Sequence, residues 1–268
     1  MNAIPLDAVD LAIAATLVVL NGALSITLRL ELAYDLAIAT IRMIVQLLLV
    51  GLVLTWLFDV VSPMWTGISA LVMIGFAGYE IVARQERRLA GGWAYGLGTA
   101  TTLFAATLVT VFALTTQIRP DPWFDPRYGI PLLGMVLGNT MTGISLGLHT
   151  LTSGLVRDRA AVEARLALGA TRWRAMHSAI RSALRSAFMP IINSMAATGL
   201  VALPGMMTGQ ILAGANPMAA VKYQILVMFL IAGGTCLGSV VAVYGGAWRL
   251  TDARHRLRLD RLTSTEEV

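Results

Sequence analysis

Long runs of apolar residues without charge limit this chain more than any other feature. A helix that spans a membrane needs about 20 mainly apolar residues, and seven such runs follow one another in the sequence. Hydrophobic residues make up 57% of the chain and charged residues 13%, which is far from the balance of a soluble domain. We therefore predict an all-α, polytopic membrane protein with seven spans, at residues 8–28, 34–58, 64–83, 95–116, 129–150, 182–204 and 219–247.

The basic residues predict how these spans are oriented. Sixteen of the 20 lysines and arginines fall in one set of loops, three fall in the opposite set, and Arg42 lies within a span. Cytoplasmic loops carry the excess of Lys and Arg, so we expect the N-terminus outside and the C-terminus in the cytoplasm. Membrane topology then explains the net charge of +5, and we expect contact with membrane lipid and no nucleic-acid partner.

Two segments depart from the simple pattern of spans and loops. After the sixth span comes "LPGMMTGQILAGANP", which is apolar but interrupted by glycines and prolines, so we expect broken helices there. After the seventh span, the chain becomes strongly basic. We therefore divide it into one transmembrane domain, residues 1–248, and a charged, solvated cytoplasmic tail, residues 249–268.

The polar segment 155–181 is the longest loop on the predicted cytoplasmic side. Its apolar positions Val162, Leu166, Ala170 and Trp173 recur at helical spacing and predict a short amphipathic helix. Binding of anionic lipid headgroups by its arginines is one interpretation. The other is a docking helix, because "EARLALGA" resembles the Glu-Ala-Ala…Gly loop with which membrane subunits of ABC transporters contact their ATPase. That resemblance selects as coupling residues Glu163, Leu166, Leu168, Gly169, Ala170 and Arg172.

The chain has no phosphate-binding loop of the form G-x-x-x-x-G-K-[ST]. Its only lysine, Lys222, does not follow such glycines. We therefore expect a permease subunit and no enzyme. If ATP drives it, ATP and Mg²⁺ bind to a separate ATP-binding subunit, and this chain needs no cofactor of its own.

Three stretches resemble a particular family. "IRMIVQLLLVGLVL", "YGIPLLGMVLGNTMTG" and "GLVALPGMMTGQILAGANPMAAVKYQI" are similar to the FetB-like family of iron-export ABC permeases, whose relatives include plant aluminium-tolerance membrane subunits. The resemblance implies a permease in the inner or cytoplasmic membrane that exports a metal ion, with iron favoured, and that works with a separate ATP-binding subunit. One unfused chain for each half of a transporter also implies a homodimer.

The chain departs from the family pattern in the sixth span. There the family carries an Asp and, three residues later, a Lys. The matching positions in this chain are Asn193 and Ala196. If the charged pair binds cargo, this chain transports something else; if the pair is structural, its replacement by uncharged residues is neutral.

Polar residues inside the spans are the candidates for a substrate path. Arg42 and Gln46 share one face of the second span, and Glu80 can pair with Arg42 if the second and third spans pack together. An arginine that extends to the membrane surface is the alternative interpretation of Arg42.

A second set of candidates comes from two similar strings, "GNTMTG" and "GMMTGQ", and from the sixth span. Broken helix ends with free polar groups are typical of translocation paths, although small and polar residues also serve helix packing. These candidates are Asn139, Met141, Asn193, Met206, Met207 and Gln210. Methionine thioethers suit soft ions, so they give no independent support for iron, and the metal ligands stay unknown.

Three alternatives stay open at this stage. An ion-coupled secondary transporter needs buried titratable groups, of which this chain has few. An ABC permease for a non-metal substrate, such as a nucleotide sugar, fits the same architecture. A membrane scaffold without transport fits less well, because broken backbone at membrane depth is tolerated only where it is buried or lines a cavity.

Overall fold

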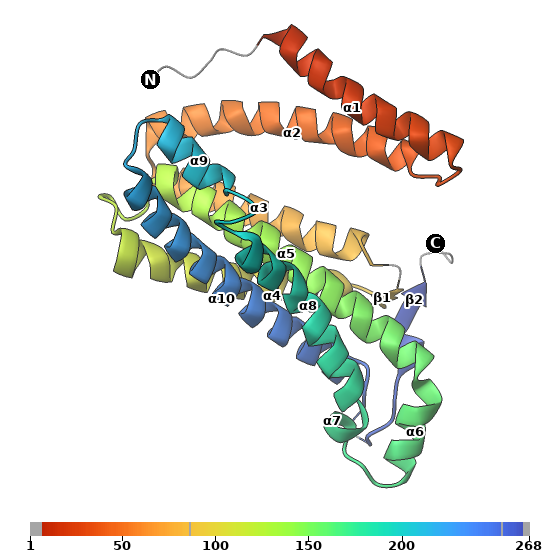
Figure 1. The fold of residues 1–268 in the computed structure, drawn as a ribbon. Coiled ribbons are helices and arrows are strands. Elements are labelled where there is room, and N and C mark those ends of the chain that lie inside the picture. The colour runs from red at the N-terminus through yellow and green to blue at the C-terminus, as the bar shows by residue number, and fades with distance from the viewer. Residues whose placement is uncertain (1–6, 86, 253, 265–268) are drawn as a thin grey trace.

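The computed structural model of the chain describes residues 7–85, 87–252 and 254–264 (Figure 1). It is almost entirely helical, and the predicted all-α class is confirmed. The helices are α1 Ala8–Thr27, α2 Ala33–Val60, α3 Pro63–Ala83, α4 Trp93–Ala113, α5 Pro126–Arg157, α6 Arg159–Ala167, α7 Arg172–Ala175, α8 His177–Ala197, α9 Gly205–Leu212 and α10 Pro217–Arg249. A π-helical turn η1, Leu114–Ile118, extends α4, and the remaining elements are β1 Arg87–Leu89, the 3-10 turn η2 Leu259–Arg261 and β2 Leu262–Ser264.

Local sequence signals explain where the long helices begin. Asp125 precedes α5, and its side chain accepts a hydrogen bond from the backbone N of Arg127 at 2.9 Å. Asn216 caps α10 in the same way, accepting from the backbone N of Met218 at 2.9 Å. A proline follows each cap, where its missing N–H costs nothing and its fixed φ suits a helix.

Six helices in the described residues are long and apolar enough to cross a membrane: α1, α2, α3, α4 with η1, α5 and α10. The predicted sixth span, 182–204, was wrong in its bounds. The corresponding helix α8 begins at His177, so that its first half includes Arg181 and Arg185, and it ends at Ala197. It ends there because Thr198 is extended and Gly199 adopts φ +94°, a left-handed conformation that favours glycine.

Helices α5 and α10 lie side by side and run in the same direction (Figure 1). Small residues allow this close approach. A Cβ on Gly143 would lie 2.7 Å from Ser239 Oγ, and one on Gly234 would lie 2.8 Å from Val136 Cγ1. Residue numbers rise together along both helices at these contacts, so α5 and α10 are parallel.

Because α5 and α10 are parallel, the chain must return along the bundle between them. Helix α8 makes the first half of this return, antiparallel to α5, with Ala179 near Gly154 and Ala187 near Gly143. The segment 198–204 and α9 make the second half, and Met206 of α9 packs against the cluster around Leu132 of α5. The return is therefore broken, as expected, but the break lies at residues 198–204, within the predicted sixth span and not after it.

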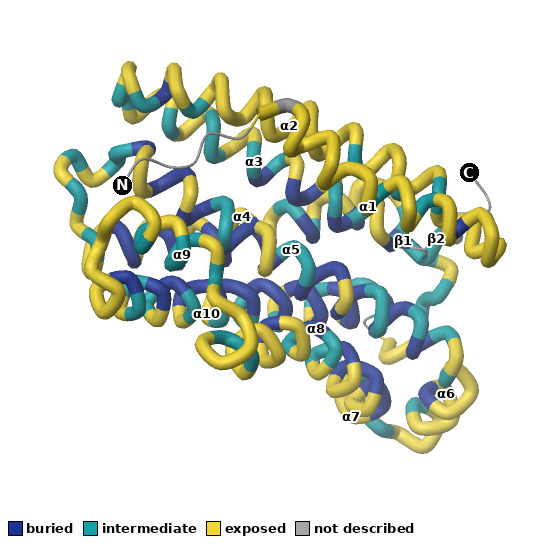
Figure 2. The backbone as a smooth tube through the Cα atoms, turned by 45° about the horizontal axis from the view of Figure 1, so that its top comes forward, coloured by how far each residue is buried: buried dark blue, intermediate teal, exposed yellow. Residues whose placement is uncertain are grey.

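Burial differs sharply between the first two helices and the rest of the chain. Helices α3, α4, α5, α8 and α10 enclose the core, whereas α1 and α2 are exposed along almost their whole length (Figure 2). The α1–α2 pair is joined to the rest by an ion pair between Arg42 and Glu80 and by a hydrogen bond from Arg127 Nη2 to Phe58 O at 3.3 Å. Leu57 near the end of α2 is fully buried.

The start of α1 and the strand β2 lie at opposite ends of the bundle (Figure 1). The end that holds β2 also holds β1, α6 and α7, and it contains the arginine-rich loops of the sequence. That this end faces the cytoplasm stays a prediction from the arginine distribution.

Candidate functional site

The coupling turn, which we define as residues 163–172, connects α6 to α7 at the arginine-rich end. The predicted single amphipathic helix was wrong: the chain forms two helices at about this place, because Gly169 adopts φ +86° between them. The predicted inward face is present, with Val162 buried and Leu166 and Ala170 half-buried against the same cluster. Leu168 is 88% exposed at the tip. An exposed leucine beside a glycine gives the turn an apolar tip that a partner can cover.

Polar contacts hold the coupling turn in place. Arg165 Nη1 donates to the carbonyl oxygen of Ala175 at 3.1 Å and to Ser178 Oγ at 3.4 Å, which ties α6 to α7 and α8. Glu163 accepts from Arg159 Nε at 2.8 Å within α6. The turn is therefore a fixed projection from the bundle.

Aromatic contacts join α7 to the end of α10. The guanidinium of Arg172 lies 5.3 Å from the centre of the Trp173 ring, and that ring lies 5.6 Å from the ring of Tyr244 on α10. Trp173 is 38% exposed, so the predicted inward position of this residue is only partly realised. The ring contact thus places α7 directly against α10.

The tail was expected to be a solvated end, and that expectation was wrong for its described residues. Strand β2 pairs antiparallel with β1, and Ala90 N donates to Arg261 O at 2.7 Å. Leu257, Leu259 and Leu262 pack on the buried cluster that also contains Ala175. Apolar leucines between the arginines explain this, because they alternate with charges that stay at the surface.

The acidic groups at this end are paired with arginines. A hydrogen bond from the Arg157 guanidinium lowers the pKa of Asp158. Arg258 donates two hydrogen bonds to the carboxylate of Asp260, each at 2.8 Å, and they lower the pKa of that carboxyl to about 2. The backbone N–H of Arg256 lowers the pKa of Asp252. These carboxylates are therefore ionised at neutral pH.

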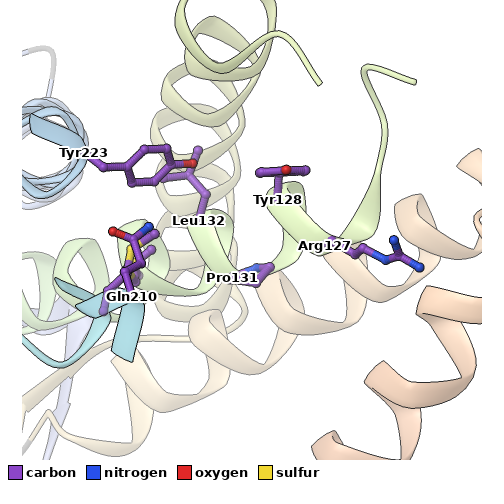
Figure 3. Close-up of a pocket in the computed structure, with 8 residues that line it drawn as sticks. Arg127, Tyr128, Pro131, Leu132, Gln210 and Tyr223 are labelled. Atoms are coloured by element: carbon purple, nitrogen blue, oxygen red, sulfur yellow. The ribbon is translucent and has the colours of Figure 1, made fainter. Parts of the chain in front are cut away.

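A pocket of about 240 Å³ with mixed polar and apolar lining lies at the opposite end of the bundle, between α5, α9 and α10 (Figure 3). Met206 and Gln210 of α9 line it. That they belong to a substrate path stays a prediction. Tyr128 and Tyr223 also line it. In Figure 3 the Tyr223 ring lies on the same side as Gln210, Tyr128 lies across from them, and the side chain of Arg127 points away. Phenol, amide and thioether groups thus meet in one cavity.

The residues predicted from the sequence do not include four that line this pocket: Arg127, Tyr128, Met135 and Tyr223. The signal was present on α5, where Tyr128, Leu132 and Met135 recur at three to four residues and so share one helix face. It was not sufficient, because nothing in the sequence says that α9 returns to that face.

The ion pair between Arg42 and Glu80 is present, as expected if α2 and α3 pack together. Arg84 Nε approaches the second carboxylate oxygen of Glu80 at 3.6 Å. A pocket of about 260 Å³ lies beside Arg84, and its lining includes Ser145 and His149 of α5. The Arg42–Glu80 pair therefore lies beside Arg84 and the part of α5 that holds Ser145 and His149, whereas the pocket of Figure 3 lies at residues 127–135 of the same helix.

The other candidate residues are not brought together in the single chain. Gln46, Asn139 and Asn193 are exposed on α2, α5 and α8, and Asn139 Nδ2 donates to Met135 O within its own helix at 2.9 Å. Met141 packs into the core. Met207 is half-buried on α9 but does not line the pocket. Among the described residues, no group of three or more His, Cys, Asp or Glu side chains is placed to hold a metal ion.

Comparison with known proteins decides the family. The model of the uncharacterised protein family UPF0014 matches residues 8–250. The chain belongs to this family. The UPF0014 membrane protein STAR2 of Oryza sativa subsp. japonica is 37% identical over 249 residues, 90% of this chain and 85% of that protein.

Other members of UPF0014 carry names that refer to metals. The probable iron export permease protein FetB of Escherichia coli is 31% identical over 262 residues, 98% of this chain and 99% of that protein. The protein ALUMINUM SENSITIVE 3 of Arabidopsis thaliana is 33% identical over 237 residues, 87% of this chain and 83% of that protein. No solved structure matches the chain. The resemblance seen in the sequence is thus confirmed at the level of the family.

Proposed function

We propose that this UPF0014 protein is the membrane-spanning permease subunit of an ATP-driven exporter in the inner or cytoplasmic membrane. The observation that carries the proposal is the coupling turn, a fixed and exposed projection from the arginine-rich end of a bundle of apolar helices. A separate ATP-binding subunit, which binds ATP and Mg²⁺, would cover Leu168 and contact the arginines around it. Membership of a family that contains a probable permease supports this.

The proposed coupling follows from how the turn is attached. The turn continues from α5 through Arg157 and Asp158, it is tied to α8 through Arg165, and α7 contacts α10 through Trp173. These are the helices that pack in the core of the bundle. Movement of the ATP-binding subunits would therefore act on α5, α8 and α10 together and would tilt the bundle as a unit.

We also propose that two copies of the chain form the transporter. The polar side chains of Gln46 and Asn139 lie within candidate spans and are exposed in the single chain. Polar groups at membrane depth are unfavourable against lipid and are usually covered by protein. A second copy would cover these side chains and would give Asn193 of α8 a protein environment.

The proposed cargo is a metal ion, with iron favoured because the Escherichia coli relative is a probable iron export permease. The pocket of Figure 3 would form part of its path. Phenol, amide and thioether groups bind a metal weakly, and a path must bind its cargo weakly enough to release it. A non-metal cargo such as a nucleotide sugar is the alternative, and the hydrogen-bonding groups of the pocket suit it.

A second candidate function is ion-coupled transport without ATP. The Arg42–Glu80 pair favours it, because a charged pair within the candidate spans α2 and α3 can exchange a proton or a coupling ion. Transport by the purified chain alone in liposomes, driven by an ion gradient, would support this function. Transport that needs the ATP-binding subunit would exclude it.

The coupling turn offers a matched test. Gly169 and Gly91 both have positive φ, +86° and +70°, both are exposed, and a Cβ added to either would meet no other atom within 4 Å. Gly169→Trp should abolish stimulation of ATP hydrolysis by the reconstituted chain, whereas Gly91→Trp, at the same end of the bundle, should preserve it. Full stimulation by Gly169→Trp, with normal insertion of both variants, would contradict the proposed coupling.

A further inference from the structure

The tail segment, which we define as residues 250–252 and 254–264, reaches the coupling turn. The backbone N of Arg172 donates to Nδ1 of His255 at 3.3 Å, across 83 positions of sequence. Arg172 is the first residue of α7, and no side chain of α7 or of its N-cap Thr171 accepts from the start of that helix. The first N–H groups of a helix lack partners within it, so His255 supplies one from the tail.

The tail holds His255 in this position by its own contacts. Asp252 accepts from the backbone N of Arg254 at 2.9 Å and of Arg256 at 2.8 Å, and its backbone O accepts from the backbone N of His255 at 3.1 Å. The result is a tight turn with His255 at φ +55°. A non-glycine residue adopts such a conformation mainly where the surrounding contacts require it.

The remainder of the tail is fixed to the bundle. Arg258 N donates to Leu250 O at 2.8 Å, and Arg261 Nη1 donates to Arg249 O at 2.7 Å. Together with the β1–β2 pairing and the buried leucines, these bonds fix the base of the turn that carries His255. The tail therefore touches the coupling turn from a rigid base.

The turn at Arg254–Arg256, which we call the tail turn, also adds positive charge beside the coupling turn. The side chains of Arg174 and Arg254 are exposed, and neither guanidinium makes a hydrogen bond or an ion pair with the described residues. The acidic groups nearby are already engaged, Glu163 by Arg159 and Asp252 by Arg256. The surface around Leu168 and Trp173 thus has an excess of positive charge from two separate segments.

We propose that the docking surface for the ATP-binding subunit is composite: the coupling turn forms one part, the tail turn at Arg254–Arg256 forms the other, and His255 positions the two. This inference rests on the proposed function. The matching surface of the ATP-binding subunit is acidic, with an apolar depression for Leu168. His255 is a positioning residue that acts through α7, and Arg254 is a contact residue.

Substitutions at His255 distinguish the role of its side-chain acceptor from the role of its backbone conformation. Gly adopts φ +55° without strain but lacks the acceptor, whereas Asn also tolerates this φ and places an oxygen near the position of Nδ1. We expect His255→Gly to weaken binding of a purified ABC ATP-binding subunit about three- to tenfold, the equivalent of one net hydrogen bond. His255→Asn should restore binding.

Hydrogen exchange on the chain alone gives a second readout that needs no partner. In lipid nanodiscs, His255→Gly should speed amide exchange in 170–176, and His255→Asn should leave it unchanged. Equal exchange in all three proteins would overturn the positioning role of His255, whatever the ATP-binding subunit does.

Charge reversal tests the contact role of the tail. Arg254→Glu should weaken binding of the ATP-binding subunit, and more strongly at low salt, whereas Arg119→Glu, an exposed arginine in the loop after η1, should not. The assay is run in vesicles with and without anionic phosphatidylglycerol. If Arg254→Glu alters only the dependence on anionic lipid, the tail turn is a lipid contact and the inference is overturned.

The same series distinguishes the inference from the function on which it rests. If the unsubstituted chain does not bind the ATP-binding subunit, the proposed function fails. If it binds, and Gly169→Trp abolishes binding while the tail variants do not, only the composite surface fails.

Discussion

Helices α2 and α10 are both strongly apolar, yet they have opposite surroundings (Figure 2). Half of the residues in the most apolar stretch of α10 are buried in the protein, and none are in that of α2. The difference lies in the glycines. A Cβ on Gly238 of α10 would lie 2.6 Å from Thr140 Cγ2, whereas Gly51 of α2 has nothing within 4 Å. Apolarity identifies a helix that enters a membrane, and small residues at a contact identify one that packs in protein.

The contrast between α10 and α2 is tested most directly by replacing one glycine in each helix with a larger residue. Gly238→Leu should destabilise the protein by about 1–3 kcal/mol, because the new side chain collides with α5 and with Ala105 of α4. Gly51→Leu should change the stability by less than about 0.5 kcal/mol. Thermal unfolding in the same detergent measures both. A large loss with Gly51→Leu would mean that another surface, such as a second copy, packs on that part of α2.

Substitutions of two glutamines test whether the pocket beside α10 contributes more to transport than the exposed face of α2. Gln210→Leu should lower iron(II) transport roughly five- to tenfold, the loss expected when one hydrogen bond to the cargo or its ligands is removed. Gln46→Leu, on the exposed face of α2, should lower it less. ATP-driven transport in proteoliposomes measures both variants. Equal losses would mean that Gln46 of α2 contributes as much to the path as Gln210 and would contradict the larger role of the pocket.

The Arg42–Glu80 pair tests how firmly α2 is attached to the bundle. Glu80→Gln should lower stability by about 1 kcal/mol or less, since Arg42 is 47% exposed and its pair is partly solvated. Asp35→Asn, near the start of the same helix and without a partner among the described residues, is the control and should have no effect. Limited proteolysis between α2 and α3 reports the loosening. Unchanged cleavage with Glu80→Gln would show that Phe58 and Leu57 suffice to hold α2.

The smallest expected effect is the pH dependence of the tail segment. This segment follows α10 and fixes its end to the bundle, and α2 has no comparable segment. Asp260 has a pKa of about 2 in the folded chain, because Arg258 donates two hydrogen bonds to it, against about 3.9 when unfolded. A lowered carboxyl pKa stabilises the tail fully above the unfolded pKa, and that contribution is lost as the pH falls toward 2. The pKa of Asp252 is shifted in the same direction.

A nitroxide label at position 254 measures this effect, with Cys236 replaced by serine. The label should become mobile only below about pH 4. Asp260→Asn should increase its mobility at neutral pH and reduce the further change on acidification. Mobilisation between pH 7 and pH 5 would contradict the assignment to carboxylates.

The sequence predicts most of the helices because long apolar runs and caps such as Asp125 and Asn216 are local signals. It predicts broken helices only from Pro204 onward and misses the break at Thr198 and Gly199. It does not predict that α8 is the least apolar pass, because that depends on how far the helix extends back to Arg181 and Arg185.

The contacts between distant segments could not be predicted. The pocket joins Tyr128 to Gln210 and Tyr223, and the tail joins His255 to Arg172. Both depend on the packing of parallel helices α5 and α10, and no local pattern in the sequence specifies which helices pack together. The Arg42–Glu80 pair is the exception, because two opposite charges within neighbouring spans have few other partners.

The measurement that tests the central claim most directly is site-specific photo-crosslinking from Leu168. A benzophenone amino acid at this position, 88% exposed at the tip of the coupling turn, is compared with one at Leu200, which is 95% exposed in the break between α8 and α9. Both variants are reconstituted with a purified ABC ATP-binding subunit and irradiated with and without ATP. The account predicts a crosslink to that subunit from position 168, with a yield that changes with ATP, and none from position 200. An intact complex that crosslinks from position 200 and not from position 168 would contradict it.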